Sequence, residues 1–293
     1  MKAAPFAYVR PDSLDHALSL LENHGPECKM IAGGMSLVPM MAMRIARPSI
    51  LVDINRLPEL KTRDQADDFI RVGAATRQCE AENDRDLRER VPLIAKALRW
   101  VGHLQTRNRG TVGGSLVHAD PSAELPLAAL VLGATMEIAG HHLGRRRLPA
   151  PEFFVDIMTT AVAETECLTA VEWPVWHGPR IGAAFEELST RHGDFAMASA
   201  AVQLQLDSAG QCTRAAFGVG GVASTPLDFP DLARQVIGYR IDEGVAREVS
   251  ELAAARTAPS TDVHADARYR RHLSSVLLER AILSAASAAA SQS

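Results

Sequence analysis

Two glycine-rich bends, far apart in the sequence, constrain this chain more than any other feature. They are residues 32–37, which read AGGMSL, and residues 111–115, which read TVGGS. Consecutive residues without a Cβ let backbone N–H groups converge on an anion, and a neighbouring hydroxyl adds a further donor. Two such bends suit the two phosphates of a dinucleotide, although paired glycines in a chain with 20 glycines are also ordinary turns.

The common dinucleotide signatures are missing from the sequence. No GxGxxG follows a predicted strand, and no GxxxxGK[ST] occurs. The nearest pattern is GVGG at residues 218–221, which follows a predicted hairpin strand with no obvious helix behind it. A Rossmann-type or P-loop nucleotide site is therefore not expected.

The composition is that of a folded protein without a polyanionic partner. The 293 residues are 47% apolar and 23% charged, which predicts one large domain or two to three smaller ones. The net charge of -4 shows no basic excess, so a nucleic-acid partner is not expected. Apolar stretches such as residues 125–136 are too short to cross a bilayer, and residues 1–10 lack the apolar core of a signal peptide. We expect a cytoplasmic protein.

The cysteines and histidines do not predict a metal centre in this chain. No CxxC pair occurs, so we expect neither a zinc site nor an iron–sulfur cluster held by this chain. His141 and His142 precede a basic run at residues 145–147, which is typical of an exposed turn. The cysteines, which we expect to be reduced thiols, are Cys28, Cys79, Cys167 and Cys212.

The first half of the chain alternates short helices and strands. Helical spacing of apolar residues predicts a helix over 13–23, and strand-like runs on either side of the first bend predict a small β-α-β unit that closes near residue 55. In the following region the apolar periodicity predicts strands over 69–73, 135–139 and 167–173 and helices over 87–101 and 124–132.

The pattern of apolar and polar residues changes from about residue 178. Alternation over 200–206 and 212–219 with a turn between them predicts a half-buried antiparallel hairpin. Two long helical patterns follow, over about 242–255 and 265–286. Residues 284–293 are almost all Ala and Ser and are expected to fray.

Several motifs in a fixed order resemble the FAD-binding medium subunit of the molybdenum hydroxylases, the family of aerobic carbon monoxide dehydrogenase and xanthine dehydrogenase. The resemblance covers almost the whole chain. Its motifs are AGGMSLVP at 32–39, DIN at 53–55, GAAT at 73–76, TVGGSL at 111–116, ADP at 119–121, RHGDFA at 191–196, DVHA at 262–265 and YRRHL at 269–273.

The resemblance implies an α+β fold. It implies a two-subdomain FAD-binding domain of the vanillyl-alcohol oxidase (PCMH) type over residues 1–177, with subdomains over about 1–56 and 57–177. A C-terminal α+β domain with an antiparallel sheet and helices is implied over residues 178–293.

The resemblance also implies the residues that bind FAD without a covalent bond. The two bends are expected to hold the pyrophosphate, Glu124 to lie near the adenosine end and Val101 to touch the flavin. Met35 departs from the polar residues of many relatives, and Glu186 and Glu187 stand where some relatives have a Lys near the flavin. The expected cofactor-binding residues are Met30, Ile31, Ala32, Gly33, Gly34, Met35, Ser36, Leu37, Val101, Thr111, Val112, Gly113, Gly114, Ser115, Glu124 and Leu168.

The function implied by the resemblance is electron transfer within a larger enzyme. A large molybdenum-cofactor subunit would hydroxylate an N-heterocycle, an aldehyde or a similar small molecule, or oxidise CO. A small subunit with [2Fe–2S] clusters would relay the electrons to FAD, which passes them to an external acceptor. No catalytic acid or base is expected in this chain, and the assembly is expected to be a dimer of heterotrimers. A free-standing FAD-dependent oxidase and a non-enzymatic nucleotide-binding scaffold are the alternatives.

Overall fold

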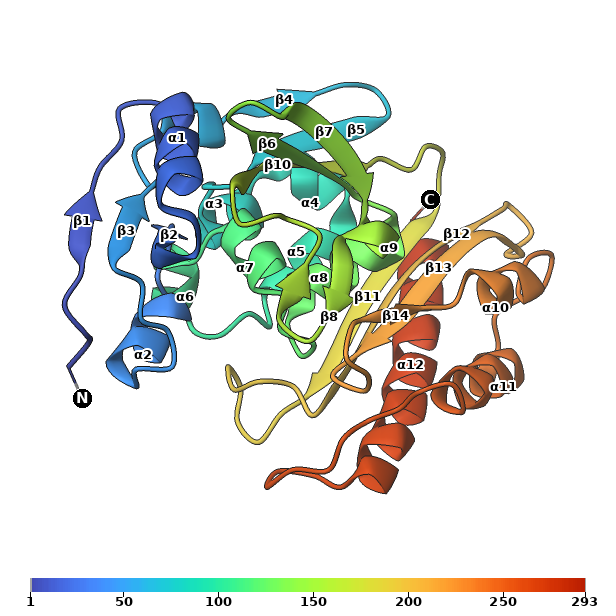
Figure 1. Cartoon of the computed structure of the whole chain (residues 1–293). Coiled ribbons are helices and arrows are strands. Elements are labelled where there is room, and N and C mark those ends of the chain that lie inside the picture. Colours follow the sequence, from blue (N-terminus) through green and yellow to red (C-terminus); the bar gives the residue numbers. More distant parts are fainter. Residues whose placement is uncertain (1, 293) are drawn as a thin grey trace.

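The computed structural model describes residues 2–292, which form three larger sheets and one two-stranded ribbon. The sheets follow one another along the chain, and helices pack between and around them (Figure 1).

The first sheet is parallel, in the order β1-β3-β2. Helix α1 connects β1 to β2, and it begins where the side chain of Ser13 accepts a hydrogen bond from the backbone N–H of His16. The predicted helix is therefore confirmed, and β2, α2 and the parallel strand β3 form the predicted β-α-β unit. The elements are β1 (Ala7–Val9), α1 (Leu14–His24), a 3₁₀ turn (Gly25–Glu27), β2 (Cys28–Ile31), α2 (Leu37–Ala42) and β3 (Ile50–Asp53).

The second sheet is antiparallel, in the order β4-β5-β10-β6-β7. Its central strand, β10, is buried over nearly its whole length, as the apolar run in the sequence indicates. The basic run at residues 145–147 is part of strand β7 and not of a turn. The elements are a 3₁₀ turn (Pro58–Leu60), β4 (Arg63–Gln65), β5 (Phe69–Gly73), β6 (Thr135–Gly140), β7 (Gly144–Pro149) and β10 (Glu166–Pro174), with the ribbon β8 (Phe154–Asp156) and β9 (Thr159–Thr160).

Seven helices accompany this sheet, all but the last lying between β5 and β6 in the sequence, and α7, α8 and α9 contact its strands. The helix predicted over 87–101 is wrong as a single element, because Val91 leaves the helical conformation before Pro92 and a new helix starts there. Val101 lies beyond the end of that second helix. The helices are α3 (Gln78–Asn83), α4 (Arg85–Arg90), α5 (Pro92–Leu98), α6 (Leu104–Arg109), α7 (Val112–His118), α8 (Glu124–Leu132) and α9 (Ala150–Phe153).

The third sheet is antiparallel, in the order β11-β12-β13-β14, and helices cover both of its faces (Figure 1). Helix α12 packs on one face, and α5 and α8 of the preceding region pack on the other. The predicted half-buried hairpin is therefore wrong in its exposure, because the face that carries Ser199 and Gln203 is also buried. The elements are β11 (Ile181–Leu188), β12 (Ala198–Leu206), β13 (Cys212–Gly220), β14 (Leu227–Asp228), α10 (Pro230–Gln235), α11 (Glu243–Ala254) and α12 (Ala267–Ala290).

The C-terminal helix is ordered further than the sequence suggests. Ala285 and Ala289 are fully buried against Gly182 of β11, and the side chain of Gln292 bonds to both backbone groups of Ile181. Fraying over 284–292 is thus a wrong prediction, and Ser293 lies outside the described residues. By length and composition α12 is also apolar enough to cross a membrane, but half of its most apolar window is buried inside this fold.

Candidate functional site

One cavity of about 1120 Å³ brings the two glycine-rich bends together. Its walls come from the first sheet, from helices α7 and α8, and from the segment at residues 190–197 between β11 and β12. Sites for small molecules commonly have about 300–1,000 Å³, so this cavity has room for a large ligand such as a dinucleotide. Every predicted cofactor-binding residue lines it except Val112, which is buried in the core instead.

The glycines allow close backbone packing at both bends, because Gly33 packs on the two residues that precede the second bend and Gly113 packs on Ala74. A Cβ on Gly33 would clash with the carbonyl oxygen of Arg109 and lie 2.8 Å from the Cα of Gly110. A Cβ on Gly113 would clash with Ala74. The absence of a Cβ at these glycines therefore allows close backbone packing, in addition to the access for phosphate that the sequence predicts.

The first bend presents free backbone donors. Within residues 2–292, the N–H groups from Gly33 to Ser36 have no backbone acceptor. The second bend differs, because the N–H of Gly113 donates to the carbonyl of Ala74 at 2.8 Å and that of Gly114 donates to Oγ1 of Thr111 at 3.0 Å. Free N–H groups on a cavity wall need an acceptor, so the first bend fits the phosphate oxygens of a cofactor better than the second.

A chain of hydrogen bonds connects the first bend to the segment that leads into the second. Asn55 donates from Nδ2 to the carbonyl of Ala32 at 2.6 Å, and its own Oδ1 accepts from Arg77 Nη2 at 2.7 Å. Arg77 also donates to the carbonyl of Arg109. The sequence pattern does not reveal Arg77, because only folding brings it between Asn55 and Arg109.

Two buried carboxyl groups lie close together, one in the cavity wall and one outside it. Burial raises the pKa of Glu124, at the start of α8, to about 7, and the charge of nearby Asp120 adds to the effect. Burial and the proximity of Glu124 raise the pKa of Glu187, on β11, to about 9. Neither carboxyl oxygen of Glu187 has a hydrogen-bond partner within residues 2–292. Glu124 lines the cavity, whereas Glu187 does not.

The C-terminal part closes the cavity through an arginine strut. Arg270 of α12 donates to the carbonyl of Met197 and to Oδ2 of Asp262, both at 2.6 Å. These contacts fix the end of the 190–197 segment, where the large side chain of Phe195 is exposed. Hydrogen bonds from Arg270 and from two backbone N–H groups hold the pKa of Asp262 well below its usual range.

Comparison with known proteins agrees with this architecture. Residues 4–176 match the family described as "FAD binding domain in molybdopterin dehydrogenase", and residues 183–285 match the "CO dehydrogenase flavoprotein C-terminal domain". The chain is 38% identical over 286 residues to the 6-hydroxypseudooxynicotine dehydrogenase complex subunit alpha of Paenarthrobacter nicotinovorans, covering 97% of this chain and 96% of the relative.

Two further comparisons support the same assignment. The caffeine dehydrogenase subunit beta of Pseudomonas sp. strain CBB1 is 33% identical, with 98% of this chain and 96% of the relative covered. The solved carbon monoxide dehydrogenase of Hydrogenophaga pseudoflava superimposes with a TM-score of 0.94 at 31% identity, covering 98% of this chain and 99% of that one. The predicted fold class is thereby confirmed, and the chain belongs to the family of FAD-binding medium subunits of molybdenum hydroxylases.

Proposed function

We propose that this chain is the FAD-binding, electron-transfer subunit of a heteromeric molybdenum hydroxylase. The observation that carries the proposal is the row of free N–H donors from Gly33 to Ser36 on the wall of a cavity that the second bend also lines. Such a row supplies hydrogen bonds to an anionic group without a cationic side chain.

The proposed FAD contacts are those that the resemblance implies, and the geometry suggests a different role for each of them. The first bend supplies amide donors to the pyrophosphate, and Ser115 of the second bend adds a half-buried hydroxyl. Glu124 and Val101 line other parts of the wall. Val112 supports the second bend from the core. The contact of Leu168 with the cofactor stays a prediction.

The chemistry divides between cofactor and chain. When bound, FAD accepts electrons from the iron–sulfur subunit and passes them to an external acceptor. The residues of this chain bind the cofactor, orient it and restrict solvent around it. The segment at residues 190–197 forms the cavity wall on the side of the C-terminal part, and Arg270 anchors this segment.

The remaining assignments concern partners, location and domain limits. Relatives carry names such as dehydrogenase "complex subunit alpha" and "medium chain", which supports partners that hold the molybdenum cofactor and the [2Fe–2S] clusters. We place the chain in a cytoplasmic heterotrimer that pairs into a dimer.

We place the domain boundary at residues 177–178, which the ends of the two family matches at 176 and 183 support.

Purification of the chain with and without its neighbouring gene products tests the function. We expect a yellow protein that releases unmodified FAD on denaturation and co-purifies with a larger and a smaller subunit. Substrate turnover by the chain alone would favour a free-standing oxidase. Nucleotide binding without flavin reduction would favour a scaffold. A chain that binds no flavin at all would contradict the proposal.

A further inference from the structure

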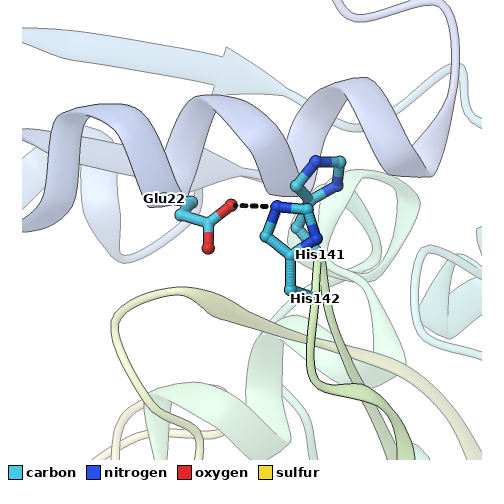
Figure 2. Close-up of side chains that lie close together, drawn as sticks. All are labelled: Glu22, His141 and His142. Atoms are coloured by element: carbon cyan, nitrogen blue, oxygen red, sulfur yellow. Dashed lines mark ion pairs between the residues drawn. The ribbon is translucent and has the colours of Figure 1, made fainter.

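Three potential metal ligands meet on the surface, at the seam between the first and second sheets. Glu22 lies near the end of α1, and His141 and His142 form the turn between β6 and β7 (Figure 2). One ligand atom from each residue lies within 4.8 Å of the others. Helix α1 and this turn are far apart in the sequence, so the cluster exists only in the folded chain.

The spacing fits ligands around one small ion. Nε2 of His142 and Oε2 of Glu22 are 3.4 Å apart, as the dashed line in Figure 2 marks. Zinc binds nitrogen and oxygen ligands at about 2.0–2.1 Å, so two ligands at a tetrahedral angle lie about 3.3–3.4 Å from each other. The rings of His141 and His142 are 4.3 Å apart between centroids, which keeps the second imidazole beside the first.

A second carboxylate orients one of the imidazoles. Nδ1 of His141 lies 2.9 Å from Oδ1 of Asp15, which precedes Glu22 by about two turns of the same helix. A proton on Nδ1, donated to Asp15, leaves Nε2 of His141 with a free lone pair. Metal-binding histidines are commonly held in this way by a carboxylate on the other ring nitrogen.

We propose that Glu22, His141 and His142 form a Zn²⁺ site, with Asp15 as a positioning residue for His141. Two imidazoles and one carboxylate suit zinc and similar transition-metal ions, whereas Mg²⁺ and Ca²⁺ prefer oxygen ligands alone. All three side chains are at least partly exposed, so an ion reaches them from solvent and water can complete its coordination.

The ion would clamp two walls of the cavity together. Leu21, which precedes Glu22, lines the cavity from α1. Gly140, which precedes His141, pairs in the sheet with Glu166, and Glu166 lines the cavity as well. The expected role of Zn²⁺ is therefore structural, because it binds only the folded arrangement and stabilises it by mass action.

Titration of the full, tag-free chain with Zn²⁺ after chelator treatment tests the site. We expect one ion per chain, a higher unfolding temperature with Zn²⁺, and a Co²⁺ absorption spectrum of a four- or five-coordinate site. The double variant His141→Ala/His142→Ala should lose the ion and the thermal shift, and Asp15→Asn should weaken binding about tenfold or more.

Two controls keep the result interpretable. His177→Ala removes an exposed histidine that lies 3.0 Å from Asp68, away from the cluster, and should bind Zn²⁺ as the wild type does. The side chain of His142 is 75% exposed, so the single variant His142→Ala should keep the fold. Loss of Zn²⁺ binding in this variant can then not be attributed to misfolding. Absence of saturable Zn²⁺ binding, or equal binding by the wild type and the double variant, overturns the proposal. FAD content is measured in parallel, so that a failure of the Zn²⁺ proposal can be told apart from a failure of the proposed FAD-binding function.

Discussion

Gly33 packs against the two residues that precede the second bend, and no side chain fits there. A Cβ would meet the backbone of Arg109 and Gly110 and push the bends apart. Gly33→Ala should therefore lower the free energy of unfolding by about 1–3 kcal/mol, as overpacking commonly does, and reduce bound FAD per chain. Thermal unfolding and the ratio of flavin to protein absorbance measure both effects. The matched control is Gly244→Ala in α11, where the nearest atom to a new Cβ is 3.3 Å away. Unchanged stability together with normal FAD content in Gly33→Ala would contradict this close packing.

Glu187 makes the stability of the chain depend on pH. The pKa of this carboxyl is raised from 4.5 to about 9 by burial and by Glu124, so the folded state keeps a proton that the unfolded state releases above pH 4.5. Stability is then lost as pH rises from about 4.5 towards 9. Glu187→Gln removes this loss and should stabilise the FAD-free chain at pH 8 by about 2–3 kcal/mol, after allowance for partial hydration.

Denaturant unfolding of both proteins between pH 5 and 9 measures the difference. The control is Glu186→Gln, one residue earlier on β11 and therefore on the opposite face of the sheet. The same slope of stability against pH in the wild type and in Glu187→Gln would contradict the assignment.

At the scale of single elements, the end of α12 is part of the core. Ala285 is fully buried where the helix crosses Gly182 of β11. Ala285→Glu should destabilise the protein by about 3 kcal/mol or more, because it places a larger, charged side chain in a closely packed contact. Ser287→Glu, at an exposed position of the same helix, should change stability little. Equal unfolding temperatures for the two variants would show that this end of the helix does not pack on the sheet.

The elements show which parts of the fold a sequence pattern can reveal. Strand β5 and helix α8 were predicted at their observed limits, because alternation and flanking glycines mark them locally. The helix break at Pro92 and the order of residues 284–290 were missed. The first depends on a single residue within a continuous periodic pattern. The second depends on Gly182, a partner about a hundred residues away that no local pattern reports.

The candidate site was likewise predicted only in part from the sequence. Its glycine bends were predicted, and all but one of the predicted cofactor-binding residues line one cavity, although much of the remaining wall was not predicted. Arg77 and the buried position of Glu187 did not, because both depend on contacts between segments that the sequence keeps apart.

For the whole molecule, a shared core predicts cooperative unfolding. Ala183, Phe185 and Ala201 of the third sheet belong to the same apolar cluster as α5 and α8. We expect calorimetry of the chain to show one transition rather than one for each domain, because neither part covers its apolar face alone. The fragments 1–177 and 178–293 should be poorly soluble when made separately and associate when made together. Two well-separated transitions would contradict a shared core.

Arg270 gives the order of chain synthesis a consequence for cofactor loading. The strut that fixes the 190–197 segment comes from α12, which follows all the other cavity-lining segments in the sequence. Until that helix is in place, the nascent polypeptide has an incomplete wall around its nucleotide cleft and an uncovered sheet beside it. We therefore expect flavin capture to follow the synthesis of α12, and premature termination before this helix to give a colourless product.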